Sequence, residues 1–149
     1  MYRRIVEARV RKAWRRLAQH DYEYVLDQFS TRFEYSFAGD HALGGTRHSR
    51  EAMTGWFERL FELFPGIRFE VADVLVKGWP WRTRVVALVD VSTDVAGEPY
   101  RNEVAQTIQL RWGRIVRIRT LEDTQKLARA LRRLAEVGVE TAELAAIED

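Results

Sequence analysis

One carboxylate interrupts an otherwise aliphatic stretch of the sequence. Asp90 lies in the segment VVALVDVS, where valine, leucine and alanine occupy almost every other position. In a strand, side chains two positions apart share a face, so Asp90 shares its face with Val86 and Leu88. A carboxylate in such surroundings must be paired, protonated or functional, because burying an isolated charge is costly. We predict that Asp90 points inward and transfers protons; the alternative is a salt bridge or hydrogen bond on the outer face of the sheet.

A second acid–base pair stands in a glycine-rich loop at residues 38–47 (AGDHALGGTR). Asp40 precedes His41, and a carboxylate beside an imidazole can orient it and favour its charged form. We predict this pair as the second candidate for catalysis. The alternative is ordinary turn chemistry, since Gly-Asp is a common loop dipeptide.

Other kinds of reactive site have little support. The chain contains no cysteine, which excludes disulfides, thiolate metal sites and cysteine nucleophiles. The three histidines, His20, His41 and His48, do not have metal-ligand spacing, and no serine lies in a nucleophile elbow. We therefore expect neither a metal nor another cofactor.

Length and composition fit one globular domain over residues 1–149. Hydrophobic residues make up 46% and charged residues 31% of the chain, which excludes a disordered polymer. No apolar run is long enough to span a membrane, and the basic N-terminus does not have the pattern of a secretory signal. We expect a cytoplasmic protein with no membrane partner. Residues 1–20 hold seven Lys or Arg against Glu7, which we interpret as a solvated helix face.

Apolar residues at three- and four-residue spacing predict helices on both sides of the main strands. Asp21 and Ser49 are the expected N-caps of the second and third helices. Pro65-Gly66 ends the third. A short strand at 32–37 (RFEYSF) precedes that helix, and the tail at 138–149 either adds a turn or frays. The expected helices cover residues 5–17, 22–29, 49–64 and 127–134.

The segment from Ile67 to Asp123 alternates in the manner of strands. Its short glycine-containing connections predict consecutive antiparallel hairpins. Helices that precede a run of strands indicate an α+β fold, in which the helices pack on one face of a curved sheet. Such a cone encloses a largely apolar pocket. The expected strands cover residues 67–77, 82–95, 99–112 and 114–122.

This order of elements resembles the SnoaL-like family of the NTF2-like superfamily over about residues 5–125. The resemblance is carried by the strand FEYSFAGD, the loop HALGGTRHSREA, the helix WFERLFELFPG and the paired strands VVALVDVSTDVAGEPYRNE and QTIQLRWGRIVRIRTLEDTQKL. It implies an NTF2-like cone. Polyketide cyclases, ketosteroid isomerases, limonene epoxide hydrolases and non-catalytic binding or assembly proteins share that shape, so the fold does not fix an activity.

At the site, the resemblance implies only part of a known catalytic set. Asp90 matches the strand acid of the epoxide hydrolases, but their arginine two residues earlier is Leu88 here. Their partner acid falls at about Thr120, and the base of the isomerases falls near Phe37. Tyr35 matches a tyrosine that helps to hold the attacking water in the epoxide hydrolases.

Two further side chains are candidates for the pocket. Trp56 of the third helix faces the sheet as pocket wall or core. Gln106 lies among apolar residues on its face and donates a hydrogen bond either into the pocket or to backbone at a bulge. Together with residues named above, they give the predicted substrate-binding set: Tyr35, Trp56, Gln106, Leu88 and Thr120.

The ends of two strands carry features of their own. Glu122 and Asp123 close the last strand, and we predict that Asp123 caps the following helix. Trp79-Pro80-Trp81 lies at a hairpin tip, where the indoles contact a second subunit, shield the pocket mouth or fold against their own sheet. Arg111, Arg117 and Arg119 can share the convex face of the sheet, which is the usual dimer surface in relatives. No aromatic stacking pattern accompanies them, so we expect no nucleic-acid partner.

These observations predict a homodimer, formed through the convex face, that binds a small apolar or polycyclic molecule in its cone. The main hypothesis is a cofactor-independent acid–base enzyme: an isomerase, a cyclase or a hydrolase. The alternative is a non-catalytic small-molecule-binding or dimeric assembly module, favoured by the missing acids at Phe37 and Thr120.

Overall fold

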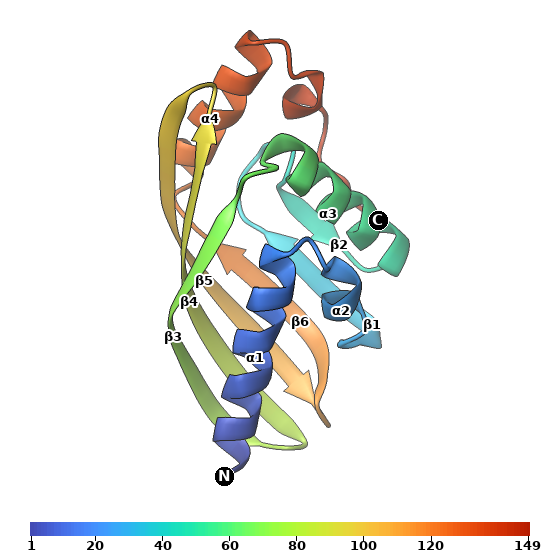
Figure 1. Cartoon of the computed structure of the whole chain (residues 1–149). Helices are drawn as coiled ribbons and strands as arrows, with labels where there is room; N and C mark the ends of the chain where they lie inside the picture. Colours follow the sequence, from blue (N-terminus) through green and yellow to red (C-terminus); the bar gives the residue numbers. More distant parts are fainter.

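Six strands form one bent sheet in the computed structural model, which describes residues 1–149 (Figure 1). Their spatial order is β2-β1-β6-β5-β4-β3, in which β1 and β6 run parallel and all other neighbours run antiparallel. The α+β cone expected from the sequence is confirmed. The strands are β1 (Phe29–Phe37), β2 (Gly45–Arg47), β3 (Arg68–Trp79), β4 (Arg82–Val95), β5 (Glu98–Arg111) and β6 (Arg114–Leu121).

Helices cover the concave face of this sheet (Figure 1). Buried Val6, Val10 and Leu17 repeat at helical spacing along α1, so one stripe of that helix faces the sheet. None of the helices combines the length and hydropathy needed to cross a bilayer. The helices are α1 (Tyr2–Ala18), α2 (Tyr22–Leu26), α3 (Arg50–Leu63), α4 (Thr124–Glu136) and a short 3-10 turn, η1 (Glu140–Glu143).

The predicted helix starts are confirmed by their caps. The Asp21 carboxylate accepts a hydrogen bond from the Tyr24 backbone N–H, and the Ser49 hydroxyl accepts one from Ala52. Asp123 accepts two, from Gln125 and Lys126 at 3.1 Å each. Each cap satisfies backbone donors that have no partner within the helix.

Strand β2 was not predicted, because three residues in a glycine-rich loop are too short to show an alternating pattern. It pairs with β1 through Tyr35 and Arg47 at one end and Phe37 and Gly45 at the other. Strand β1 also begins earlier than expected, since Phe29 already pairs with Ile115 of β6.

The C-terminal tail lies against β2. The Arg47 guanidinium donates to the carbonyl of Ile147 at 2.8 Å, and the His48 backbone N–H donates to the Asp149 carboxylate at 2.5 Å. These bonds hold the last residues beside a strand that would otherwise be an open edge of the sheet.

Candidate functional site

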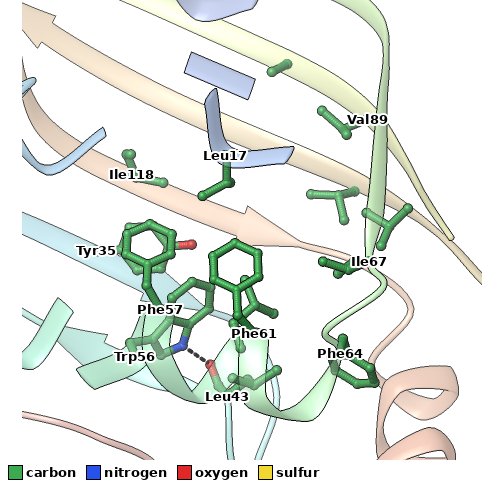
Figure 2. Close-up of a cluster of buried hydrophobic side chains, with 14 of the residues drawn as sticks. Leu17, Tyr35, Leu43, Trp56, Phe57, Phe61, Phe64, Ile67, Val89 and Ile118 are labelled. Atoms are coloured by element: carbon green, nitrogen blue, oxygen red, sulfur yellow. Dashed lines mark hydrogen bonds between the residues drawn. The ribbon is translucent and has the colours of Figure 1, made fainter. Parts of the chain in front are cut away.

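The space between the helices and the concave face of the sheet is a cavity of about 130 Å³, of whose 28 lining residues 23 are hydrophobic. Figure 2 shows its aromatic side, where Tyr35 of β1 lies beside Trp56 and Phe57 of α3. Few polar groups interrupt the apolar lining, so each of them helps to determine which ligands the cavity can bind. The polar lining residues are Arg9, Gln28, Gln106, Thr120 and Glu122.

Trp56 forms a rigid part of the wall. Its side chain is 2% exposed, and its indole N–H donates to the backbone carbonyl of Leu43 at 2.8 Å (Figure 2). The ring packs against Tyr35 with centroids 5.1 Å apart. Because its indole N–H already donates within the protein, Trp56 contributes an apolar surface of fixed shape to the cavity and no hydrogen bond to a ligand.

A buried arginine braces this wall from behind. Arg47 is fully buried, and its guanidinium lies 5.4 Å from the ring centroids of both Tyr35 and Trp56. It donates to the carbonyls of Gly44, Gly45 and Ile147. This role could not be predicted, because nothing in the loop sequence marks Arg47 as buried.

Gln106 and Thr120 form a polar pair on the floor of the cavity. They are register partners on β5 and β6, are 7% and 2% exposed, and share a hydrogen bond of 3.1 Å from Gln106 Nε2 to Thr120 Oγ1. Tyr35 lines the same cavity, and burial raises the pKa of its hydroxyl to about 12, so it stays protonated. Four of the five predicted substrate-binding residues, Tyr35, Trp56, Gln106 and Thr120, therefore line one cavity.

Glu122 is the one acidic residue that lines the cavity. It follows β6 directly, and its Oε1 atom is buried without a hydrogen-bond partner. Burial, together with the neighbouring charge of Asp123, raises the pKa of this carboxyl to about 7. From the sequence, Glu122 is predicted only to close the last strand. The signal was present, because Ile118, Thr120 and Glu122 alternate on the inner face.

Two polar side chains on β5 organise the surroundings of Glu122. Asn102 is 5% exposed; its Oδ1 accepts from the Asp123 backbone N–H at 3.3 Å, and its Nδ2 donates to the Asp123 carbonyl at 3.0 Å. The same Nδ2 donates to the hydroxyl of Tyr100 at 2.9 Å. Because Tyr100 accepts there, its own proton remains free to be donated. Tyr100 lines the cavity, and burial raises the pKa of its hydroxyl to about 12.

The predicted inward orientation of Asp90 is wrong. On β4 the inner face carries Val85, Ala87, Val89 and Val91, whereas Asp90 and Leu88 are exposed on the outer face. The four inner residues are all aliphatic, whereas the outer face of β4 carries the charged Arg84 and Asp90. The helices therefore cover the aliphatic face, and neither Asp90 nor Leu88 lines the cavity.

Asp40 and His41 do not meet in the cavity either. Asp40 is exposed, and the imidazole of His41 bonds locally to its own loop. Its Nδ1 accepts from the Leu43 backbone N–H at 3.2 Å, and its Nε2 lies 3.1 Å from the Ala38 carbonyl. Burial lowers the pKa of His41, which favours the neutral ring that this pair of bonds requires. His41 therefore stabilises the fold of its own loop, which agrees with the alternative of ordinary turn chemistry.

A family model described as the SnoaL-like domain matches residues 10–118 of the sequence. The chain belongs to the SnoaL-like family. No curated protein matches the sequence of this SnoaL-like chain. Its fold is shared with solved structures of low sequence identity, which bear on the fold alone.

Three of these structures illustrate the NTF2-like fold. An NTF2-like protein of unknown function from Burkholderia pseudomallei is 18% identical, with a TM-score of 0.71 over 83% of this chain and 95% of that one. PrhC from Penicillium brasilianum is 18% identical, with a TM-score of 0.70 over 91% of each chain. A proposed isomerase from Bacillus subtilis is 16% identical, with a TM-score of 0.66 over 85% of this chain and 91% of that one.

Proposed function

We propose that this protein is a cofactor-independent acid–base enzyme that acts on a small apolar molecule, with Glu122 as its proton carrier. The supporting observation is the buried, unpartnered Oε1 of Glu122 in a cavity that is otherwise almost wholly apolar. A carboxyl group with a pKa of about 7 is present in both protonation states at neutral pH, so it can take up and return a proton.

The neighbouring hydroxyls complete a simple proton-transfer cycle. The Glu122 carboxylate removes a proton from a carbon next to a carbonyl, and electrons move onto the carbonyl oxygen. Tyr100, whose proton is free, hydrogen-bonds that oxygen. Glu122 then returns the proton to the same or another carbon, and the latter outcome is an isomerisation.

The cavity limits the size of the substrate. An engineered apolar cavity of about 150 Å³ holds one benzene ring. The cavity here, about 130 Å³, therefore favours a molecule of about one ring over a polycyclic one. Its mostly aliphatic and aromatic lining favours a substrate with a single polar group, placed near Glu122.

The experiment is a thermal-shift screen against small cyclic ketones, lactones and epoxides, followed by mass spectrometry in deuterated water. We expect a ketone that stabilises the wild type to gain deuterium next to its carbonyl. Glu122→Gln should bind this ketone and exchange at least about a hundredfold more slowly. The matched control is Asp90→Asn, which removes an exposed carboxylate and should exchange at the wild-type rate.

The non-catalytic alternative makes a different prediction in the same experiment. A binding module would show ligand stabilisation with no deuterium gain in the wild type. The aliphatic lining and the satisfied indole of Trp56 are compatible with such a module. Exchange that is equal in the wild type and in Glu122→Gln would move the chemistry to another group.

The proposed homodimer is supported by the charge pattern on the outer face of β3, β4 and β5. Three carboxylates are register neighbours across it: Glu70, Asp90 and Glu103. Nearer the hairpin tips, Lys77 faces Arg84, and Leu88, opposite the exposed Asp73 of β3, lies between the two charged rows. A two-fold axis perpendicular to the strands would bring the basic row of one protomer to the acidic row of its partner.

Analytical ultracentrifugation tests the dimer. We expect Leu88→Glu to shift a wild-type dimer to monomer, because it places a second carboxylate opposite Asp73 at the centre of the face. Leu144→Glu, at an exposed apolar residue outside the sheet, is the control and should remain dimeric. A monomeric wild type would contradict the proposal.

A further inference from the structure

Three tryptophans are exposed together at one end of the sheet. Trp79 and Trp81 of the β3–β4 turn are 64% and 54% exposed, and Trp112 of the β5–β6 turn is 73% exposed. Their ring centroids lie 6.0 Å apart for Trp79 and Trp81 and 6.3 Å apart for Trp81 and Trp112. We call these three side chains the tryptophan tip. Contiguous exposed apolar surface of this kind marks an interaction site.

The two turns that carry the tryptophan tip are joined to each other. The backbone N–H of Trp112 donates to the carbonyl of Pro80 at 2.7 Å. The hydroxyls of Tyr2 and Thr83 are hydrogen-bonded, which brings the start of α1 to the same end of the molecule (Figure 1). The tip is thus a built surface drawn from three segments that are distant in the sequence.

Cations surround the tryptophan tip, and the strand segments next to it carry no carboxylates. Residues 74–89 and 104–121 contain no Asp or Glu. Seven basic residues at this end are exposed, and none forms an ion pair with a carboxylate. They are Arg3, Arg4, Lys77, Arg82, Arg84, Arg111 and Arg114.

One end of the cavity lies directly behind this surface. Arg9 of α1 lines the cavity and donates to the carbonyl of Gly113 at 2.9 Å. Gly113 follows Trp112 in the β5–β6 turn. An apolar molecule that entered the cavity at Arg9 would therefore come from the neighbourhood of the tip.

We propose that the tryptophan tip docks on the surface of an anionic lipid bilayer. Indole rings favour the headgroup level of a bilayer, where their apolar body and polar N–H are both accommodated. Exposed arginines beside them bind lipid phosphates and respond to the negative surface potential. Docking of this kind needs no spanning segment. It replaces our expectation that no membrane partner exists, and it holds whether or not Glu122 is catalytic.

Two other partners fit the tip less well. A second copy docked tip to tip would bring two sets of arginines together, which is repulsive. A single-stranded nucleic acid would need open ring faces for base stacking. Trp79 and Trp81 instead stack on each other, with 10° between their ring planes. The proposed dimer face is centred on Leu88, further along the strands, and shares only Lys77 and Arg84 with the cations near the tip.

Co-sedimentation with vesicles tests the proposal. We expect the wild type to bind vesicles of equal parts phosphatidylcholine and phosphatidylglycerol, more weakly as salt is added, and not to bind phosphatidylcholine alone. Binding should shift tryptophan emission to the blue, since three of the five tryptophans belong to the tip. Replacing all three with alanine should weaken binding by at least about tenfold.

Paired charge variants separate a local effect from net charge. Arg82→Gln with Arg111→Gln, beside the tip, should weaken binding by about tenfold and flatten its salt dependence. Arg68→Gln with Arg101→Gln removes the same charge from exposed positions at the other end of β3 and β5, and should bind like the wild type. Thermal unfolding confirms that each variant is folded.

Three results would overturn the proposal. One is a wild type that ignores anionic vesicles or binds both vesicle types equally. Another is an alanine variant that is folded and binds as the wild type does. The third is tip-dependent self-association, or tip-dependent binding of a single-stranded oligonucleotide, by a wild type that leaves vesicles unbound; that would assign the tip to a second copy or to nucleic acid.

Discussion

Glu122 and Asp90 are both carboxylates associated with long strands of the same sheet, yet they lie in opposite environments. Glu122 lines the apolar cavity with one oxygen buried and unpartnered. Asp90 is exposed on the outer face, between Glu70 and Glu103 on the neighbouring strands. The comparison shows that aliphatic neighbours in sequence do not make a reactive acid. The face of the sheet that the helices cover does.

The largest expected difference between the two acids is in proton transfer. Glu122→Gln keeps the shape of the side chain but removes the group that takes up the proton, so exchange on a bound ketone should fall at least about a hundredfold. Asp90→Asn should leave the rate unchanged. Mass spectrometry in deuterated water measures both rates. A larger loss of exchange rate in Asp90→Asn than in Glu122→Gln would contradict the assignment of Glu122 as the proton carrier.

A second difference concerns stability against pH. Since folding raises the pKa of Glu122 from 4.5 to about 7, the folded protein holds this proton more tightly than the unfolded chain. The resulting stability is present in full below pH 4.5 and is lost as the pH rises through 7. Relative to Glu122→Gln, the wild type should lose about 3 kcal/mol of unfolding free energy over this range.

Denaturant unfolding at pH 4.5, 6 and 8 measures this effect. Asp90→Asn serves as the control, since the Asp90 carboxylate is exposed to solvent and is not desolvated on folding. A constant difference between the wild type and Glu122→Gln at all three pH values would show that Glu122 is not held in an apolar environment.

Asn102 holds the backbone next to Glu122 through its bonds to Asp123. Asn102→Ala removes the bonds to both backbone groups of Asp123 and to the Tyr100 hydroxyl, and should cost about 1–3 kcal/mol of unfolding free energy. If Asn102 positions Glu122, exchange should slow while ligand affinity changes little. Chemical denaturation and exchange kinetics measure the two effects. Lower stability with an unchanged exchange rate would limit Asn102 to a structural role.

The smallest expected effect is on the outer face. Asp90→Asn removes one of three carboxylates that face one another across β3, β4 and β5. Like charges directly opposite are unfavourable. At a protein concentration low enough to keep the protein monomeric, so that no partner's basic row faces Asp90, the variant should be more stable by up to about 0.5 kcal/mol at low salt, and less so at high salt. Thermal unfolding at two salt concentrations checks this. A loss of more than 1 kcal/mol, on the order of a lost buried contact, would contradict the exposed placement.

Much of the fold could be predicted from sequence, because local signals agree with the final structure. Asp21, Ser49 and Asp123 cap the expected helices, and the glycine-containing turns join the expected hairpins. The inner face of β4 could not be fixed in this way. Both of its faces carry valine or leucine, and the helices that choose between them are distant in sequence.

The site, too, could be predicted only where local sequence patterns determine it. Tyr35, Gln106 and Thr120 were placed in the cavity by alternation and by resemblance, and they lie there. Glu122 was passed over because it follows the strand, although alternation extends to it. Arg47 could not be found at all, since its burial depends on the C-terminal tail that folds back over it.

The pKa of Glu122 is the most direct test of the central claim. Carbon-13 NMR of protein labelled at the glutamate carboxyl would record every glutamate, and Glu122→Gln would identify the resonance of interest. We expect one carboxyl resonance that titrates with a midpoint of about 7 and is missing from Glu122→Gln. A Glu122 resonance that titrates near 4.5 would contradict this expectation.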